Sequence, residues 1–241
     1  MTILTNDTGK FEMAHPEFPL EQVLDLACAA QRINNAYIKQ TEFVYDSEMK
    51  PLYRKEPNKF LMLFTLGLEK AYDDQFRPEL LNVIQADREQ AEGIRKFFRR
   101  YMFGAVAGDN EFQTEVNAIL NSETVARNKF GFIACLPSVM ARDQQRLNQT
   151  RNLKAADNEP LGMPGDVFTD LDCEIVSAKH SENYDAWNIC AIINNRIVSW
   201  FSKVELKTGP CVVIKAKVKA IGENWHTKKI ETRLNYVKAA Q

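Results

Sequence analysis

The hydrophobic pattern of the last third of the chain is strand-like. Short apolar runs lie between clusters of turn-forming residues, at 172–178, 186–193, 196–201, 211–221 and 230–238. Successive side chains of a strand point to opposite faces, so short runs of this kind predict β-strands rather than helices. Asn194-Asn195 is a hairpin signal between the second and third runs, because Asn tolerates positive φ. Five short antiparallel strands predict a small barrel such as the OB-fold.

The fourth run has the clearest alternation of polar and apolar residues. Lysines alternate there with apolar side chains, in the order Ile214, Lys215, Ala216, Lys217, Val218 and Lys219. A period of two predicts that the three lysines lie on one face of the strand and the three apolar residues on the other. Exposed lysines also protect strands from pairing with other chains, so the lysine row by itself identifies no binding face.

The pattern before residue 155 is helical. Apolar residues recur there at spacings of three and four, which predicts helices over about 19–40, 79–106, 111–121 and 137–153. Pro137 is expected at the first position of the last helix, and Asp87, with Gln90 three residues on, is expected to cap a helical piece. Residues 43–46 and the turn after them predict a short strand, whereas 59–66 fits a strand or a helix equally well.

A loop separates the two patterns. Residues 155–166 hold two Pro and two Gly, which is typical of a linker. The predicted class is therefore α+β: a mainly helical region over 1–155, a linker over 156–168 and a five-stranded OB-like β-barrel over 169–241.

Charge is balanced overall but uneven along the chain. The 241 residues have a formal net charge of -1 and 26% charged residues. Residues 196–241 hold ten Lys and Arg against three acids, whereas residues 166–195 hold one Lys against six acids. A balanced total argues against coating of nucleic acid by global charge, but it allows one basic face.

The cysteines and the N-terminal residues suggest a compartment. Five cysteines are scattered with no C-x-x-C pair, which is typical of free thiols in a reducing environment. The first residues do not resemble a signal peptide, and the longest apolar run, 60–64, is too short to span a bilayer. We expect a soluble cytoplasmic protein (in the host cytoplasm if it is viral) with no membrane partner.

Cations and aromatic residues near the end of the chain are the candidate chemistry. Single-stranded nucleic acid is bound by phosphate attraction together with base stacking, and both residue types occur here. The candidate nucleic-acid-binding residues are Lys215, Lys217, Lys219, Trp225, Lys228, Lys229, Arg233, Trp200 and Tyr184. For the adjacent pair Trp200 and Phe201, one side chain must point into the core, because neighbouring strand residues face opposite sides.

Catalytic and metal sites are not predicted. His15, His180 and His226 have no ligand-like spacing, and the common hydrolase, metalloprotease and nucleotide-binding motifs do not occur. Asp185 with Glu205-Leu-Lys207 weakly mimics the carboxylate and lysine set of metal-dependent nucleases, but that segment runs directly into a Gly-Pro turn. No cofactor or metal is expected.

Two strings in the last third carry a resemblance to a family. Residues 212–219 read V-V-I-K-A-K-V-K, and residues 232–238 read T-R-L-N-Y-V-K. With these strings, residues 172–238 resemble the OB-fold modules of phage and mobile-element single-stranded DNA-binding and replication accessory proteins. Those proteins often end in an acidic tail, whereas this sequence ends in V-K-A-A-Q.

The resemblance implies an OB-fold and a function in nucleic-acid metabolism. The expected function is non-catalytic binding of single-stranded DNA, or RNA, in phage-type replication, recombination or transcription, with replication or transcription proteins as further partners. Two alternatives stay open: a protein–protein adaptor that uses the barrel and helices as docking surfaces, and a metal-dependent nuclease.

Overall fold

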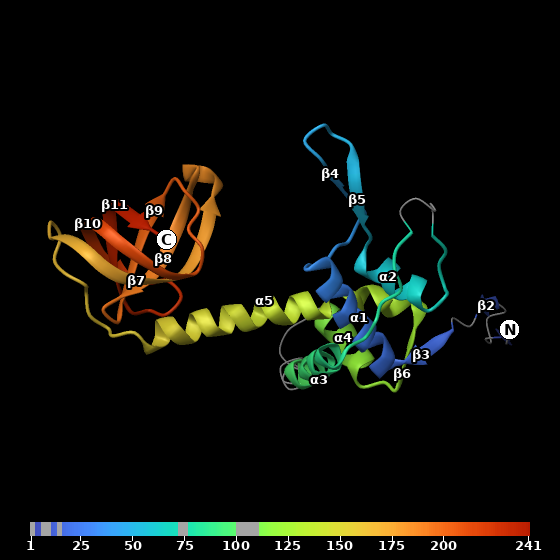
Figure 1. The fold of residues 1–241 in the computed structure, drawn as a ribbon. Helices are drawn as coiled ribbons and strands as arrows, with labels where there is room; N and C mark the ends of the chain where they lie inside the picture. Colours follow the sequence, from blue (N-terminus) through green and yellow to red (C-terminus); the bar gives the residue numbers. More distant parts are fainter. Residues whose placement is uncertain (1–2, 6–10, 14–15, 72–76, 100–110) are drawn as a thin grey trace. The chain divides into compact units, whose positions relative to one another are not determined.

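The chain folds into two compact units in the computed structural model (Figure 1). The structure describes residues 3–5, 11–13, 16–71, 77–99 and 111–241. The first unit comprises Met1–Arg142 and the second Asp143–Gln241, so the division falls inside helix α5 (Phe130–Ala155) and not in the loop that follows it. Helices are the main regular structure in the described part of the first unit and five strands close a barrel in the second, which confirms the predicted α+β class.

Four helices and the start of α5 form the core of the described part of the helical unit. They are α1 (Leu20–Asn34), α2 (Asn58–Thr65), α3 (Gln85–Arg99) and α4 (Glu111–Leu120). Helix α1 ends earlier than predicted, because Asn35 adopts a left-handed conformation with a φ of 53° and terminates it. The ambiguous segment 59–66 is helical, and the predicted continuation of α3 over 100–106 lies outside the described residues.

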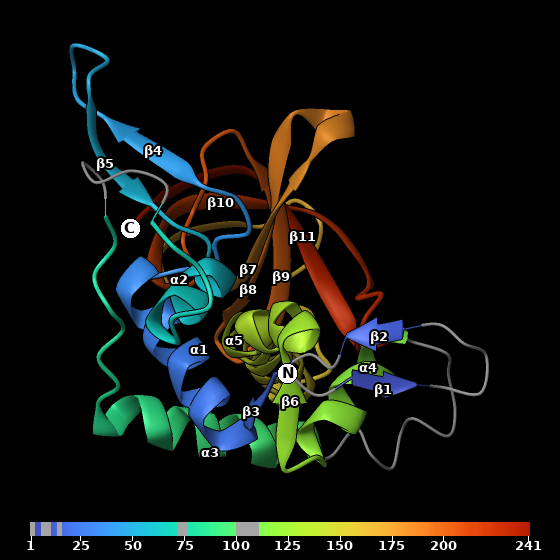
Figure 2. The ribbon, with the colours of Figure 1, turned by 90° about the vertical axis from the view of Figure 1, so that its right-hand side faces the viewer.

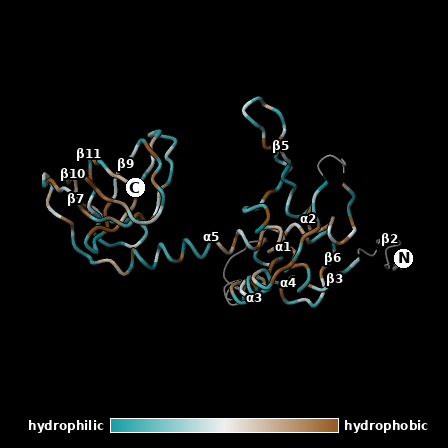
Figure 3. Tube along the Cα trace, viewed as in Figure 1, coloured by the Kyte–Doolittle hydropathy of each residue, from teal (hydrophilic) through white to brown (hydrophobic). Residues whose placement is uncertain are grey.

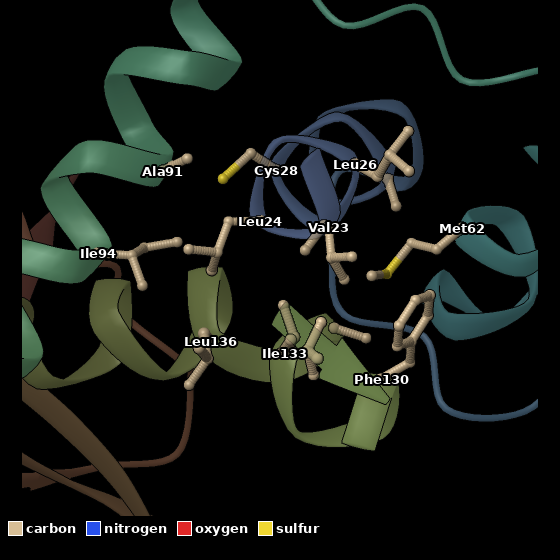
Figure 4. Packing of buried hydrophobic residues seen from close by; sticks show 14 of the residues in the cluster. Val23, Leu24, Leu26, Cys28, Met62, Ala91, Ile94, Phe130, Ile133 and Leu136 are labelled. Atoms are coloured by element: carbon tan, nitrogen blue, oxygen red, sulfur yellow. The ribbon is translucent and has the colours of Figure 1, made fainter. Parts of the chain in front are cut away.

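The core of this unit is the apolar face of α1 and the residues that surround it. Figure 4 shows Leu24 of α1 facing Ile94 of α3 and Leu136 of α5. All three side chains are almost fully buried. Phe130 and Ile133 are also fully buried, so packing holds the first turns of α5. The predicted start of this helix at Pro137 is therefore wrong: the helix begins at Phe130, and Pro137 lies inside it without a backbone N–H to donate.

Asp87 is an acid inside the first turn of α3 rather than its N-cap. Its Oδ2 accepts the backbone N–H of Ile84 at 3.0 Å, and its carboxylate accepts Nε and Nη2 of Arg32, both at 2.9 Å. Burial alone would raise the pKa of Asp87, but these hydrogen bonds to its charged form outweigh burial and lower that pKa below its ordinary value. Asp87 is therefore not the N-cap that the sequence predicted. It lies in the first turn of α3 and accepts a backbone N–H at the start of the helix, as the acid of a capping box does.

Three small antiparallel pairs complete the described part of this unit. Strand β1 (Ile3–Thr5) pairs with β2 (Phe11–Met13), and β3 (Glu17–Pro19) with β6 (Thr124–Ala126). Strand β4 (Glu42–Tyr45), which contains most of the predicted strand 43–46, pairs with β5 (Pro51–Lys55). The β4–β5 hairpin projects away from the helices of its unit in both views (Figures 1 and 2).

Five strands close the barrel of the second unit. They are β7 (Val167–Ser181), β8 (Ala186–Ile193), β9 (Arg196–Ser202), β10 (Gly209–Glu223) and β11 (Ile230–Ala240). Their order around the barrel is β7-β8-β9-β11-β10 and back to β7. All pairs are antiparallel except β9 with β11, which is parallel. This connectivity is that of an OB-like barrel, and each of the five predicted runs lies within one of its strands.

One face assignment in β10 differs from the prediction. Ala216 and Val218 are 1% and 2% exposed and point into the barrel, as expected. Ile214, however, is 45% exposed, because the register with β11 shifts between Val213 and Lys215. A bulge of this kind places two consecutive residues on the same side, so Ile214 shares the outer face with Lys215.

The loop between α5 and β7, predicted as a linker, is hydrogen-bonded to the barrel. The N–H of Leu161 donates to Oγ1 of Thr232 at 2.9 Å. The N–H of Gly165 donates to the carbonyl of Val218 at 3.0 Å, and the N–H of Val218 donates to the carbonyl of Asp166 at 2.8 Å. These bonds fix the loop to β10 and β11, so it is part of the barrel unit.

Helix α5 changes character along its length. Its first turns carry core residues, whereas most side chains over 141–152 are exposed, and Figure 3 shows this stretch as mainly hydrophilic. Its end turns apolar again, with Leu153 and then Ala156 packed on Val176 and Ile197 of the barrel. Within the described ranges, no helix is both long enough and apolar enough to cross a bilayer.

Candidate nucleic-acid interface

The three lysines of β10 lie exposed on the outer face of the barrel. Lys217 is paired in register with Asn235 of β11, and Ala220, next to Lys219, is paired with Arg233. Arg233 is in turn paired with Ser199 of β9. The barrel therefore places Arg233 beside the lysine row, although the two are far apart in sequence.

This arrangement forms a path across the strands. From Ala220 on β10, beside Lys219, the register leads to Arg233 on β11 and to Ser199 on β9, and Phe201 lies two residues further along β9. Neighbouring strands are about 4.8 Å apart, so the two steps between strands cover about 10 Å. Cations lie at one end of this path and a half-exposed aromatic ring at the other.

Trp225 is held out into solvent by a well-bonded loop between β10 and β11. The indole is 75% exposed, and its Nε1 donates to Nε2 of His226 at 3.0 Å. Behind it, the buried side chain of Asn224 accepts the backbone N–H groups of His226 at 3.2 Å and of Thr227 at 3.1 Å. Because these bonds already order the loop, binding to the exposed face of Trp225 should cost little conformational entropy.

The two lysines of this loop have different partners. Lys228 is exposed, with its Nζ 3.2 Å from a carboxylate oxygen of Glu223. Nζ of Lys229 donates to the carbonyl of Lys154 at 2.5 Å and also to the carbonyl of Ala156. These are the free carbonyls at the end of α5, where a cation is favourable. The ammonium of Lys229, one of the candidate binding residues, is therefore hydrogen-bonded to the end of the helix in the structure.

The structure separates the adjacent aromatics of β9. Trp200 is 4% exposed and belongs to the barrel core, so its indole has no face free for a base. Phe201 points outward and is 55% exposed. The expectation for Trp200 is therefore corrected in favour of Phe201: the pair was recognised in the sequence, but the alternation along one strand does not say which of its faces is buried.

Tyr184 forms an aromatic pair with Phe201. Tyr184 lies in the loop between β7 and β8, is 67% exposed, and has its ring centroid 5.1 Å from that of Phe201. Nζ of Lys203 donates to the carbonyl of Asp185 at 2.9 Å, which ties this loop to the residue after β9. This pairing could not be predicted from the sequence, because it depends on how β8 and β9 are aligned.

The aromatic pair and Trp225 lie at opposite ends of β9. Trp187, near the β7–β8 loop, is paired with Ser202 at the end of β9, whereas Glu231, near the Trp225 loop, is paired with Ile197 at its start. Five residues of strand separate these two points, or about 17 Å. The predicted residues therefore form two groups joined by Arg233 and the lysine row, and not one cluster.

Acidic side chains and the end of α5 occupy part of the outer barrel surface between these two groups. A carboxylate oxygen of Glu231 accepts from the hydroxyl of Ser199 at 2.6 Å, the other accepts from Asn224 at 2.6 Å, and Nε of Arg233 lies 3.8 Å away. The end of α5 covers Ile197 on the same outer surface. The ion pair between Lys228 and Glu223 is exposed and therefore weak, so Lys228 can exchange its carboxylate partner for a phosphate.

The nuclease-like residues lie exposed in two loops of the barrel. Glu205 and Lys207 are exposed in the loop between β9 and β10, and Asp185 is exposed in the loop between β7 and β8. In the parts of the chain that the structure describes, no three His, Cys, Asp or Glu side chains are grouped to hold a metal ion.

No family model, curated protein or solved structure matches this chain.

Proposed function

We propose that the barrel binds single-stranded DNA or RNA without chemistry, in replication, recombination or transcription of a phage-like genome. The observation that carries this proposal is the exposed row Lys215, Lys217 and Lys219 beside Arg233, with exposed aromatic rings at both ends of β9. Phosphates pair with the cations, and bases stack on Trp225 and on Phe201.

The proposal rests on two contributions of different kinds. Cations supply a sequence-independent attraction to the phosphates that weakens with salt. Aromatic stacking contributes about 1–3 kcal/mol for each base and tolerates any sequence. The outer face of the OB-like barrel offers both, and the loops after its first and fourth strands carry Tyr184 and Trp225, in the places where this fold class holds ligands.

A second candidate, a protein–protein adaptor, is favoured by the β4–β5 hairpin. Five large apolar side chains are between 46% and 75% exposed there: Phe43, Tyr45, Met49, Leu52 and Tyr53. A two-stranded hairpin is only marginally stable alone, and exposed apolar patches often mark interaction sites. This surface and the barrel surface are compatible with one protein that binds nucleic acid and a partner.

Fluorescence anisotropy with labelled oligo(dT) tests the main proposal. We expect binding at low salt that weakens steeply as salt rises, and weaker binding with a smaller salt slope for Lys217→Glu. The slope should fall by about 0.7 for each phosphate contact that is lost. Trp225→Ala should weaken binding without unfolding the protein.

Lys50→Glu is the matched control, because Lys50 is an equally exposed lysine on the β4–β5 hairpin, where it pairs with Glu48. Its affinity for oligo(dT) should equal that of the unmodified chain. No binding at low salt, or equal losses for Lys217→Glu and Lys50→Glu, would reject the proposed interface. Mg²⁺-dependent degradation of the oligonucleotide would instead favour the nuclease.

A further inference from the structure

Two cysteines face each other across neighbouring strands of the barrel. Cys173 of β7 and Cys211 of β10 are direct partners in the antiparallel register. Both belong to the same core cluster and are 6% and 5% exposed, so both side chains point to the inside of the barrel.

The backbone geometry suits a disulfide. Residues directly opposite in an antiparallel pair have Cα atoms about 4.5 or 5.5 Å apart, depending on their hydrogen bonding. Disulfides span Cα distances of about 4.4–6.8 Å, so either case lies in range. The thiol of Cys211 now donates to the carbonyl of Ala240 at 3.3 Å, and a rotation about its Cα–Cβ bond would turn the sulfur toward Cys173.

A cavity lies beside the two cysteines. Its volume is about 560 Å³, and both cysteines line it. The acids Asp172 and Glu174 and the end of the chain at Gln241 are also part of its wall. This space is large enough to admit one arm of a small disulfide such as oxidised glutathione.

We propose that Cys173 and Cys211 form a redox modification site that closes to a reversible disulfide between β7 and β10. The thiolate of Cys211 attacks one sulfur of a low-molecular-weight disulfide, which releases one thiol and leaves a mixed disulfide. The thiolate of Cys173 then attacks Sγ of Cys211 and releases the second thiol. The two cysteines lose two electrons and two protons, and the small disulfide is reduced to two thiols.

The surroundings of the sulfurs make this reaction slow at neutral pH. Burial, with smaller contributions from Cys211 and Glu174, raises the pKa of Cys173 to about 12. Burial also raises the pKa of Cys211. The thiolate is the nucleophile, so the rate should rise about tenfold for each pH unit while the thiolate is the minor form.

The other cysteines offer no equivalent pair. Cys190 is opposite Ser177 on one side and Ser199 on the other, and Cys28 and Cys135 lie on different helices. A disulfide formed in the folded chain should therefore have a single connectivity.

Mass spectrometry of the folded, reduced full-length chain tests the proposal. After incubation with oxidised glutathione below the unfolding temperature, we expect an intact mass lower by about 2 Da and two fewer thiols that react with iodoacetamide after denaturation. A non-reducing peptide map should join Cys173 to Cys211, and dithiothreitol should restore the starting mass. Cys190→Ser should behave in the same way.

Cys173→Ser should instead stop at the mixed disulfide, with glutathione retained on Cys211. A map that joins other cysteines, a pairing that forms only in denaturant, or a full set of reactive thiols after prolonged oxidation would overturn the proposal. The main measurement uses the unmodified chain and no nucleic acid. Its outcome is therefore independent of the test of the proposed function.

Discussion

Both units have apolar cores, but they differ in the charged residues that they bury. In the described residues of the helical unit, Glu56 and Asp87 are buried, at 4% and 1% exposure, whereas the β4–β5 hairpin exposes a group of large apolar residues. The barrel has an apolar interior, and no charged residue among those described in it is buried. Its cations lie outside, beside Trp225 and Phe201.

This difference separates two kinds of surface. Aromatic rings flanked by lysines and arginine, as on the barrel, suit a ligand that offers phosphates and bases. On the hairpin, Phe43 and Tyr53 lie among charges of both signs, with Glu42 opposite Lys55 and Lys50 paired with Glu48. That surface suits a neutral protein partner better than a polyanion.

Trp200→Ala tests the barrel interior and has the largest expected effect. Trp200 is buried in the core, so truncation should lower the free energy of unfolding by about 3–5 kcal/mol. Phe201→Ala, one residue on, should change it by less than about 1 kcal/mol, because Phe201 is half-exposed. Urea denaturation of both variants gives the comparison. Similar losses for the two would contradict the assignment of inner and outer faces.

Asp87→Asn tests the polar interior of the helical unit. Asp87 accepts two hydrogen bonds from Arg32, so we expect a loss of about 1–3 kcal/mol in the free energy of unfolding at pH 7. The pKa of Asp87 is lowered in the folded state, so its stabilisation is present above the unfolded-state pKa. It is lost as pH falls through the lower, folded-state value.

The pH dependence is therefore the sharper measurement. The difference in unfolding free energy between the original chain and Asp87→Asn should shrink as pH is lowered from 7 toward 3. Asp46→Asn, on the exposed hairpin turn, serves as the control for the general effect of acid. A difference that is independent of pH would show that Asp87 acts through its shape and not its charge.

The difference between the two units also explains how much of each could be predicted from the sequence. The barrel strands follow a period of two with an apolar interior, so all five were found close to their positions. Ile214 was assigned to the wrong face because a bulge depends on how β10 pairs with its partner strand. The pattern of a single strand holds no information on that pairing. The hydrogen-bond partners of Lys229 could not be predicted for a related reason, since they are carbonyls at and just after the end of α5, more than seventy residues earlier.

Less of the helical unit could be predicted from its sequence. The segment 59–66 is apolar along most of its length, so its pattern has no distinct period, and packing made it a helix. Pro137 resembles a helix start in sequence, but the buried Phe130 and Ile133 extend the helix upstream. Boundaries set by tertiary packing are not encoded in local propensity.

Phe201→Ala sharpens the contrast between the two surfaces. If a base stacks on Phe201 and Tyr184, each truncation to Ala should cost about 1–3 kcal/mol in oligo(dT) binding. The double variant should lose less binding free energy than the sum of the two single losses, because the two rings contact each other, with 5.1 Å between their centroids. Fully additive losses would place the rings in separate subsites.

The smallest expected effect belongs to the hairpin. Tyr53→Ser replaces a half-exposed ring that is paired in register with Val44, so stability should change by no more than about 1 kcal/mol. Oligo(dT) affinity should not change, because the hairpin offers no run of cations for the phosphates. Anisotropy titrations of Tyr53→Ser and Phe201→Ala at one salt concentration test this directly. A loss for Tyr53→Ser as large as that for Phe201→Ala would extend the nucleic-acid surface to the helical unit, and exposed aromatics without a cation row would then suffice for binding.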